Sequence, residues 1–257
     1  MKNAKKQKVS TIFLMAMAMS VAVSCSKDDN KDLTDEREEV VFGAEVAVGN
    51  GKVRSFIKRN EDGSPKSFGL TFPEGALEGL PEEGGSYIIP MPADNNTIVN
   101  HVSFDYAAHH HVPVYDTPHI TTHFYFISEE EKNNITDTGA AMENLPAAEF
   151  RPTNYIPTEG GVPKMGKHWL DSKAEELNGQ PFKRSLAFGS YDGKFIFFEP
   201  LINMEFLRAK PNAAWPVEQQ SQVQTTGFYA NSYALAFDEN TALYTLSFDD
   251  LRLRSKE

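Results

Sequence analysis

The strongest constraint on the fold is a succession of short apolar segments separated by turn-forming residues. The clearest turn is Tyr191-Asp192-Gly193-Lys194, which lies between the apolar segments 185–190 and 195–201. An Asp-Gly pair between two apolar runs is a strong signal for a β-hairpin. A second hairpin is predicted to join 233–237 to 243–248 through residues 238–241.

Further strand signals dominate the chain, and helical signals are few. An alternating segment at 40–48 is predicted to pair with 52–58 across Gly49-Asn50-Gly51. Other strands are predicted at 67–72, 86–90, 97–106 and 118–127, and short helices at 129–133, 140–145 and 172–177. Many short strands and few helices predict a mainly β fold, an antiparallel sandwich or barrel with a few short helices.

The first 24 residues have the pattern of a lipoprotein signal peptide. Four lysines precede an uncharged apolar run at 9–23. Its 15 residues are fewer than the roughly 20 that a membrane-spanning helix needs. The small residues Ala22-Val23-Ser24 then precede Cys25 and resemble a lipobox, in which the cysteine thiol receives a diacylglycerol.

Cys25 is the only cysteine of the chain, and lipidation explains a lone cysteine in an exported protein. The alternative is a transmembrane anchor with an incidental cysteine. We therefore predict a signal peptide at 1–24, a lipidated Cys25 with a flexible tether to residue 37, and one β-rich domain at 38–257.

The residues after Cys25 bear on where the protein is anchored. Ser26 resembles the residue that sorts lipoproteins to the outer membrane, and Lys27-Asp28-Asp29 resembles a cell-surface export signal. An ordinary solvated linker is the alternative reading of that charged run. We expect a lipid-anchored outer-membrane protein that faces the periplasm or the cell surface.

Composition excludes several classes of function. Removing residues 1–24 removes four lysines and no acid, so the net charge changes from -11 to -15. An acidic domain without a basic patch is a poor nucleic-acid binder, because that binding depends on neutralising phosphates. The sequence also has no nucleophile elbow, phosphate-binding loop or His-Glu-x-x-His motif.

The histidines are the most informative residues of the predicted domain. All seven lie between His101 and His168, and histidine is the commonest metal ligand. On an extended chain, His109 and His111 would point the same way, roughly 7 Å apart. Together with later histidines they would form a three- or four-nitrogen site, suited to Zn, Cu, Fe or Ni. An exposed loop without a role is the alternative for this pair, and His101 is expected to be structural.

A strand at 118–127 would place His119, Thr121, His123 and Tyr125 on one face. Residues four apart on a regular strand are roughly 13 Å apart, so His119 and His123 would barely reach one metal ion. A bend in the strand, or a strand that begins after His119, would bring them together. Otherwise both are half-buried sheet residues.

Glu199 follows the apolar run 195–198 and precedes Pro200. A carboxylate in so apolar a strand is costly unless it is paired or bound to a cation. We therefore consider Glu199 a candidate ligand or general base. The alternative is a solvent-exposed strand end.

Several motifs resemble a family of exported bacterial domains of unknown function, over about residues 100–207. The similar segments are Tyr115-Asp116-Thr117-Pro118-His119, His123-Phe124-Tyr125, Pro163-Lys164-Met165-Gly166-Lys167-His168-Trp169, Asn178-Gly179-Gln180-Pro181-Phe182, Gly189-Ser190-Tyr191-Asp192-Gly193 and Phe198-Glu199-Pro200. The resemblance implies no known activity. It does imply that His109, His111, His119, His123, His168 and Glu199 match recurrent residues of that family.

Two departures from the family pattern concern the predicted site. Val112 stands where a Glu usually follows His-x-His, and Thr121 stands where an Asp usually separates the later histidines. If that Asp is a ligand or a base in the family, this chain has lost the activity or altered the metal.

Two main functional hypotheses follow. The first is a metal-binding lipoprotein with a transition metal ion, Zn among the candidates, held by the five histidines, with Glu199 as ligand or base; whether it is an enzyme stays open. The second is a non-catalytic module for a glycan or protein partner, with Trp169, Trp215, Phe228 and Tyr229 as a stacking platform or as core. A structural envelope protein is a third reading. Converging histidines favour the first, and an exposed aromatic strip favours the second.

Lipidation at Cys25 predicts that the substitution Cys25→Ser releases the protein from membranes. The thioether to diacylglycerol would then be lost, and with it the two acyl chains that give stable anchoring. Fractionation of cells that express each form, with labelling by an alkyne-bearing fatty acid, measures this. A Ser24→Ala variant is the matched control and should keep label and membrane association. Equal labelling of the Cys25→Ser variant and the wild type would contradict lipidation at Cys25.

Overall fold

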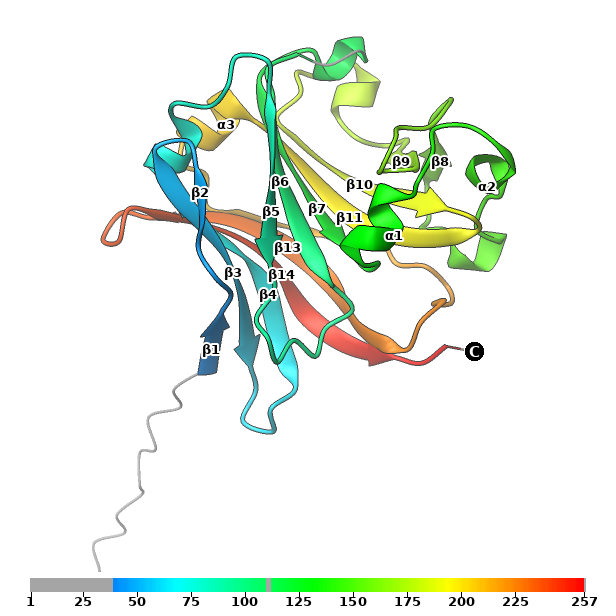
Figure 1. The fold of residues 1–257 in the computed structure, drawn as a ribbon, viewed down its shortest axis with the longest axis horizontal. Helices are drawn as coiled ribbons and strands as arrows, with labels where there is room; N and C mark the ends of the chain where they lie inside the picture. Colours follow the sequence, from blue (N-terminus) through cyan, green and yellow to red (C-terminus); the bar gives the residue numbers. More distant parts are fainter. Residues whose placement is uncertain (1–38, 110–111, 257) are drawn as a thin grey trace, which may run out of the picture. The chain divides into compact units, whose positions relative to one another are not determined.

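The strands form two antiparallel sheets within residues 39–109 and 112–256, the part of the chain that the computed structural model describes (Figure 1). The predicted signal peptide, Cys25, the tether and His111 lie outside the described residues. In spatial order, the first sheet contains β1 (Glu39–Phe42), β3 (Gly51–Arg59), β4 (Pro65–Pro73), β14 (Leu243–Arg254), β13 (Gly227–Asp238) and β12 (Ala213–Pro216), with β2 (Val46–Val48) also beside β3.

The second sheet contains, in spatial order, β5 (Gly85–Pro90), β6 (His101–Ala107), β7 (His119–Tyr125), β11 (Lys194–Asn203), β10 (Arg184–Tyr191), β9 (Lys167–Asp171) and β8 (Tyr155–Pro157). The two sheets pack face to face as a sandwich. The prediction of a mainly β antiparallel fold is thus confirmed, and of its two forms the sandwich is the correct one.

The helices are short and lie in the connections. They are α1 (Glu129–Asn133), α2 (Ala140–Glu143) and α3 (Met204–Arg208), with 3-10 turns at Glu74–Leu77, Pro113–Tyr115, Ala148–Phe150 and Glu176–Asn178. Within the described residues, none of these helices has the length and apolarity required to cross a bilayer.

Both predicted hairpins are confirmed. Strands β10 and β11 pair up to Tyr191 opposite Lys194, and β13 and β14 pair up to Asp238 opposite Leu243. The predicted strand at 40–48 is instead divided into β1 and β2, both of which pair with β3. The break lies at Gly43, where an added Cβ would overlap the Ser55 hydroxyl and a backbone carbonyl of β5, so the chain approaches its neighbours too closely to continue a regular strand.

Two helical segments differ from the prediction. The segment at 172–177 forms only the 3-10 turn Glu176–Asn178. Conversely, α3 follows β11 directly and was not predicted. The side chain of Asn203 caps it by accepting hydrogen bonds from the backbone N–H groups of Glu205 and Phe206, which satisfies donors that a helix start leaves open.

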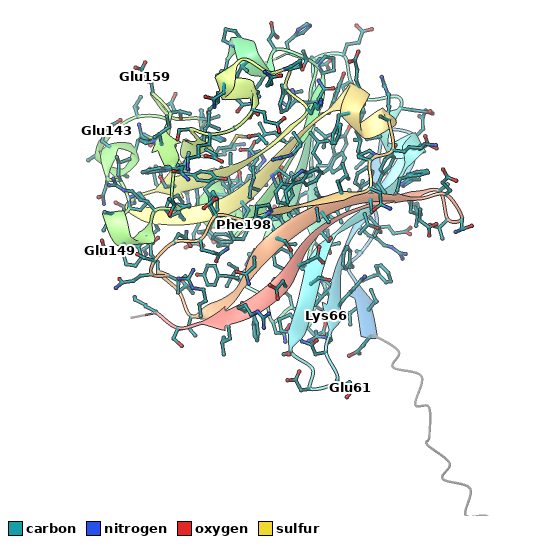
Figure 2. All side chains as sticks on the ribbon, turned by 180° about the vertical axis from the view of Figure 1, so that it is seen from behind. Glu61, Lys66, Glu143, Glu149, Glu159 and Phe198 are labelled. Atoms are coloured by element: carbon teal, nitrogen blue, oxygen red, sulfur yellow. The ribbon has the colours of Figure 1, made fainter. Side chains whose placement is uncertain are left out.

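Aromatic rings fill the space between the two sheets. The Phe248 ring of β14 lies 5.0 Å from that of Phe124 in β7 and 5.2 Å from that of Phe198 in β11, measured between centroids. Figure 2 shows Phe198 in the interior, whereas the charged side chains of Glu61 and Glu143 project outward. This inner layer holds the sheets together without a disulfide.

The outer face of the second sheet is also covered. The connection between β6 and β7 and the loops between β7 and β10 pack on it, and with residues of the strands they form two small apolar clusters. The Tyr115 cluster comprises Tyr115, Phe182, Ala187 and Leu201. The Tyr125 cluster comprises Tyr125, Ile135, Ile196 and Phe197. Every residue of β7 is therefore buried, on both faces of the sheet.

The inner aromatic layer predicts that Phe248→Ala is strongly destabilising. Phe248 is 0% exposed and contacts rings of both sheets, so its loss should lower the free energy of unfolding by about 3–5 kcal/mol. The matched control is Phe42→Ala, because Phe42 is 42% exposed and its ring lies under the Arg54 guanidinium, a contact worth about 0.5–1 kcal/mol. Urea unfolding followed by circular dichroism measures both. Similar midpoints for the two variants would contradict this account of the core.

Candidate metal centre

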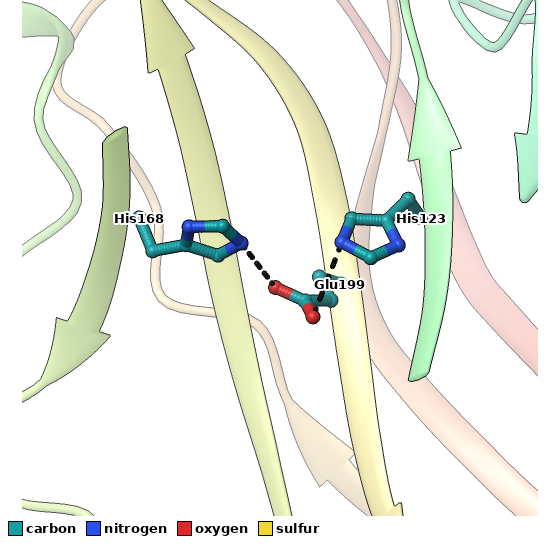
Figure 3. Close-up of side chains that lie close together, drawn as sticks. All are labelled: His123, His168 and Glu199. Atoms are coloured by element: carbon teal, nitrogen blue, oxygen red, sulfur yellow. Dashed lines mark ion pairs between the residues drawn. The ribbon is translucent and has the colours of Figure 1, made fainter. Parts of the chain in front are cut away.

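Three strands of the second sheet place one polar residue each on its outer face. These residues are His123 of β7, His168 of β9 and Glu199 of β11 (Figure 3). Phe198 lies opposite Phe124, and Leu201 lies opposite Thr121, so the register between β11 and β7 brings Glu199 beside His123. Sheet pairing, rather than nearness in sequence, thus assembles the group.

The Glu199 carboxylate lies between the two imidazoles. Its Oε1 is 3.2 Å from His123 Nε2, and its Oε2 is 3.3 Å from His168 Nε2. The side chains of His123 and Glu199 are 2% and 5% exposed, and that of His168 is 17% exposed. The group is therefore almost completely removed from water, with His168 on its accessible side.

A second carboxylate holds the other nitrogen of His123. His123 Nδ1 lies 2.8 Å from Asp105 Oδ2 on the neighbouring strand β6. The Ser103 hydroxyl donates to Asp105 Oδ1 at 2.7 Å and lies 3.1 Å from the Ser86 hydroxyl. This chain of contacts fixes the ring orientation of His123 and directs its Nε2 toward Glu199.

An aromatic ring positions both histidines. The Phe197 ring centroid is 4.8 Å from that of His123 and 5.4 Å from that of His168. The ring lies over Gly189 of β10, where an added Cβ would overlap it. In the strand pairing, Gly189 lies opposite His168 of β9 and opposite Phe197 of β11. Because Gly189 has no side chain, the Phe197 ring has room between the two histidines.

Charge compensation dominates the electrostatics of the group. Burial on its own raises the pKa of the Glu199 carboxyl, but His123 and His168 outweigh it and hold this pKa well below its usual range. Burial lowers the pKa of His123, whereas the Glu199 charge and the Asp105 hydrogen bond raise it, with a net value of about 10. Without a metal, His123 is therefore an imidazolium between two carboxylates.

The geometry of the group fits a metal ion. One ligand atom from each of His123, His168 and Glu199 lies within 4.8 Å of the other two. In a tetrahedral site with bonds of about 2.1 Å, ligand atoms are about 3.4 Å apart. Moreover, His123 Nε2 and Glu199 Oε2 are buried, and their ion-pair contacts at 3.2 and 3.3 Å do not have hydrogen-bond geometry. Such unsatisfied buried atoms are rare in proteins and require an explanation.

A cavity of about 350 Å³ reaches the accessible side of this group. Both His168 and Glu199 line it, together with mainly apolar residues of the covering loops. A ligand in the cavity would therefore meet the group on the side of His168. This side also offers the space for a further metal ligand.

The structure brings together some of the predicted site residues and not others. His123, His168 and Glu199 form the group, and Glu199 is buried rather than at an exposed strand end. His109 is 87% exposed and lies 3.4 Å from Asp116. His119 is buried, with its Nδ1 at 2.6 Å from the Thr117 carbonyl and its ring against Phe182. His111 lies outside the described residues.

The strand β7 begins at His119 and pairs regularly with β6 throughout. His119 and His123 therefore remain separated as on an ordinary strand, and His119 is not part of the group. Thr121, on the same face, lies opposite Asp105, and Val112 lines the cavity. Among the remaining histidines, His101 stacks on Tyr125 with centroids 4.9 Å apart, and burial and nearby Lys132 lower its pKa to about 4, in line with a structural role.

The aromatic residues proposed for a stacking platform do not form an exposed strip. Trp169 is 1% exposed, and its indole N–H donates to the Ser190 hydroxyl. Tyr229 is also buried, and Trp215 and Phe228 are half-buried. The pattern is that of core and half-core residues.

Asp105 and Ser103 were missed in the sequence. The signal that identifies them is the alternation of β6, in which Ser103 and Asp105 share a face while Val102 and Phe104 point into the core. Polar residues that alternate with a buried apolar set, on a strand beside the histidine-bearing strand, indicate a polar cluster on the other face.

Comparisons with known proteins identify no function. A family model described as "TTHB210-like: Hypothetical protein TTHB210" matches residues 60–106, from β4 to β6. This match contains Asp105 but none of His123, His168 and Glu199. It overlaps the segment at about 100–207, which carries the family motifs, only in the first few residues of that segment. No curated protein and no solved structure gave a significant match.

The raised pKa of His123 predicts a pH-dependent stability of the metal-free protein. A folded-state pKa of about 10 lies above the ordinary 6.5, so the stabilisation is complete below pH 6.5 and is lost as the pH rises through about 10. Relative to His123→Gln, the wild type should therefore lose unfolding free energy between pH 6.5 and 10.

Urea unfolding in the presence of a chelator, repeated across this pH range, measures the difference. The exposed His109→Gln variant is the control and should follow the wild type. Parallel curves for the wild type and His123→Gln would show that His123 is not held in its charged form.

Proposed function

We propose that His123, His168 and Glu199 bind a divalent transition metal ion and form a catalytic centre at the base of the cavity. The observation that supports this most directly is the convergence of three ligand atoms at a buried site, where the contacts of His123 Nε2 and Glu199 Oε2 lack hydrogen-bond geometry. A metal ion would satisfy both atoms at once.

The number of ligands favours catalysis over a structural role. Structural zinc sites are closed by four protein ligands, whereas catalytic sites use three and keep a position for water or substrate. Here the described residues supply two imidazoles and one carboxylate, and the cavity lies on the remaining side. When bound, such a metal acts as a Lewis acid and lowers the pKa of a bound water.

The chemistry of the donors limits the choice of metal. Two imidazoles and a carboxylate occur both in catalytic zinc sites and in the facial triads of non-haem Fe(II) sites. The group contains no thiolate or thioether, the ligands that select Cu(I). Zn and Fe(II) are therefore the candidates that we favour.

The neighbours of the group resemble the outer shell of a metal site. A metal-bound histidine usually donates its second N–H to a carboxylate, which orients the ring and raises its basicity. Asp105 occupies this position for His123 at 2.8 Å. We further propose that the centre belongs to a lipoprotein anchored through Cys25, so that it acts outside the cytoplasm.

Metal binding by this group predicts one equivalent of Zn²⁺ or Co²⁺ per wild-type chain. The variants His123→Ala, His168→Ala and Glu199→Gln should each lose it, because two remaining ligands rarely retain a metal. Asp105→Asn should weaken binding by roughly 10–100-fold, since it alters only the outer shell. Elemental analysis and competition titration of the untagged domain measure these effects.

His109→Ala is the matched control, because His109 is exposed and outside the group. It should bind metal as the wild type does. The proposal fails if the wild type takes up no transition metal, or if His109→Ala loses it while His123→Ala retains it.

A further inference from the structure

The cavity beside the candidate metal centre has the properties of a substrate pocket. Its volume of about 350 Å³ lies within the usual range for small-molecule sites. An apolar cavity of about 150 Å³ holds one benzene ring, so this one has space for a ligand of roughly one to two rings. The metal group forms one end of it, through His168 and Glu199.

The lining of the cavity is mainly apolar. The apolar and aromatic side chains come from the 3-10 turn Pro113–Tyr115 and the residue before it, from the loop before β9, and from β9 and β11. They are Val112, Tyr115, Val162, Leu170 and Leu201. Tyr115 and Leu201 belong to the Tyr115 cluster, and Val112 and Leu170 pack against it. One side of the cavity is thus a packed, preformed surface that favours an apolar ligand.

The charges around the cavity disfavour an anionic ligand. The described lining residues include the carboxylates Glu159 and Glu199 and no lysine or arginine. Glu159 is exposed and projects at the surface (Figure 2). At the other end, the two charges of a divalent metal would be balanced by Glu199 and Asp105. No excess positive charge would remain to attract a carboxylate or phosphate.

We propose that this pocket binds a neutral, mainly apolar molecule of one to two rings that carries one uncharged donor atom able to reach the metal. The inference rests on the proposed metal centre, because that centre supplies the contact for the donor atom. The apolar surface supplies the affinity, and the acidic surroundings select against anions of the same size.

Three probes of graded chemistry test this on the Co²⁺-loaded protein, whose visible spectrum reports ligands that reach the metal. The first probe is 4-phenylimidazole, which is neutral and carries a phenyl ring. The second is imidazole, which lacks the phenyl ring, and the third is benzoate, which has the phenyl ring and a negative charge. Burial of the phenyl ring should make 4-phenylimidazole bind roughly tenfold or more tightly than imidazole. Benzoate should bind more weakly than 4-phenylimidazole.

A pocket-filling variant and a matched control locate the binding. Val162→Phe places a ring in the cavity and should remove the advantage of 4-phenylimidazole over imidazole. Val40→Phe makes the same change at an exposed position of β1 and should leave it unaltered. If Val162→Phe does not fold, Leu170→Phe narrows the same pocket from β9. Metal content is measured for every variant.

The possible results separate the two proposals. Failure of the wild type to take up Co²⁺ overturns the metal centre and with it the pocket assignment. If the wild type takes up Co²⁺, three results would overturn the substrate class alone. They are 4-phenylimidazole binding no more tightly than imidazole, benzoate binding most tightly of the three probes, and a pocket-filling variant that does not change the preference.

Discussion

The second sheet depends on the compensation of one buried charge, the carboxylate of Glu199. Removing an ion of this kind from water costs several kcal/mol, and the fold offsets this only by placing compensating groups around it. His123 and His168 lie within 3.3 Å of its oxygens. Because these residues come from β7, β9 and β11, the charge requirement links strands that are distant in sequence and requires their register to be kept.

The inner face of the second sheet packs the core, whereas its outer face carries the polar group. The inner face belongs to the aromatic layer around Phe248, in which packed rings from both sheets supply the stability. The outer face is covered by two small apolar clusters, between which the polar group lies. A sheet whose stability comes from one face can accept costly, unsatisfied polar atoms on the other, and such departures from good packing are expected at functional sites.

Periodicity and turn chemistry were sufficient to predict the fold. The Asp192-Gly193 turn identified the β10–β11 hairpin, and the alternation around His123 separated its face from the core face of Phe124. These signals are local, so they can be read from neighbouring residues. The division of β1 from β2 could not be read in this way, because it arises from the close approach of Gly43 to another strand.

The site was predicted only in part, for the same reason. His123, His168 and Glu199 were all candidates, but which histidines converge depends on strand order and on the register of β9, β10, β11 and β7. The pair at positions 109 and 111 was attractive because it is close in sequence, yet His109 lies exposed beside Asp116. The spacing argument against one ion shared by His119 and His123 agrees with the regular pairing of β7.

The charge balance of the group offers a physical reason for a metal ion. Without one, the imidazolium of His123 faces the carboxylates of Glu199 and Asp105, so that this buried trio carries one excess negative charge. A divalent ion that replaces the proton on His123 Nε2 would cancel this excess and bond Glu199 Oε2, whose 3.3 Å contact with His168 lacks hydrogen-bond geometry. Buried charge is least costly when it is fully compensated, and metal coordination is one of the means by which proteins achieve this. The same replacement leaves His123 Nδ1 bound to Asp105, so metal binding would require little rearrangement of the sheet.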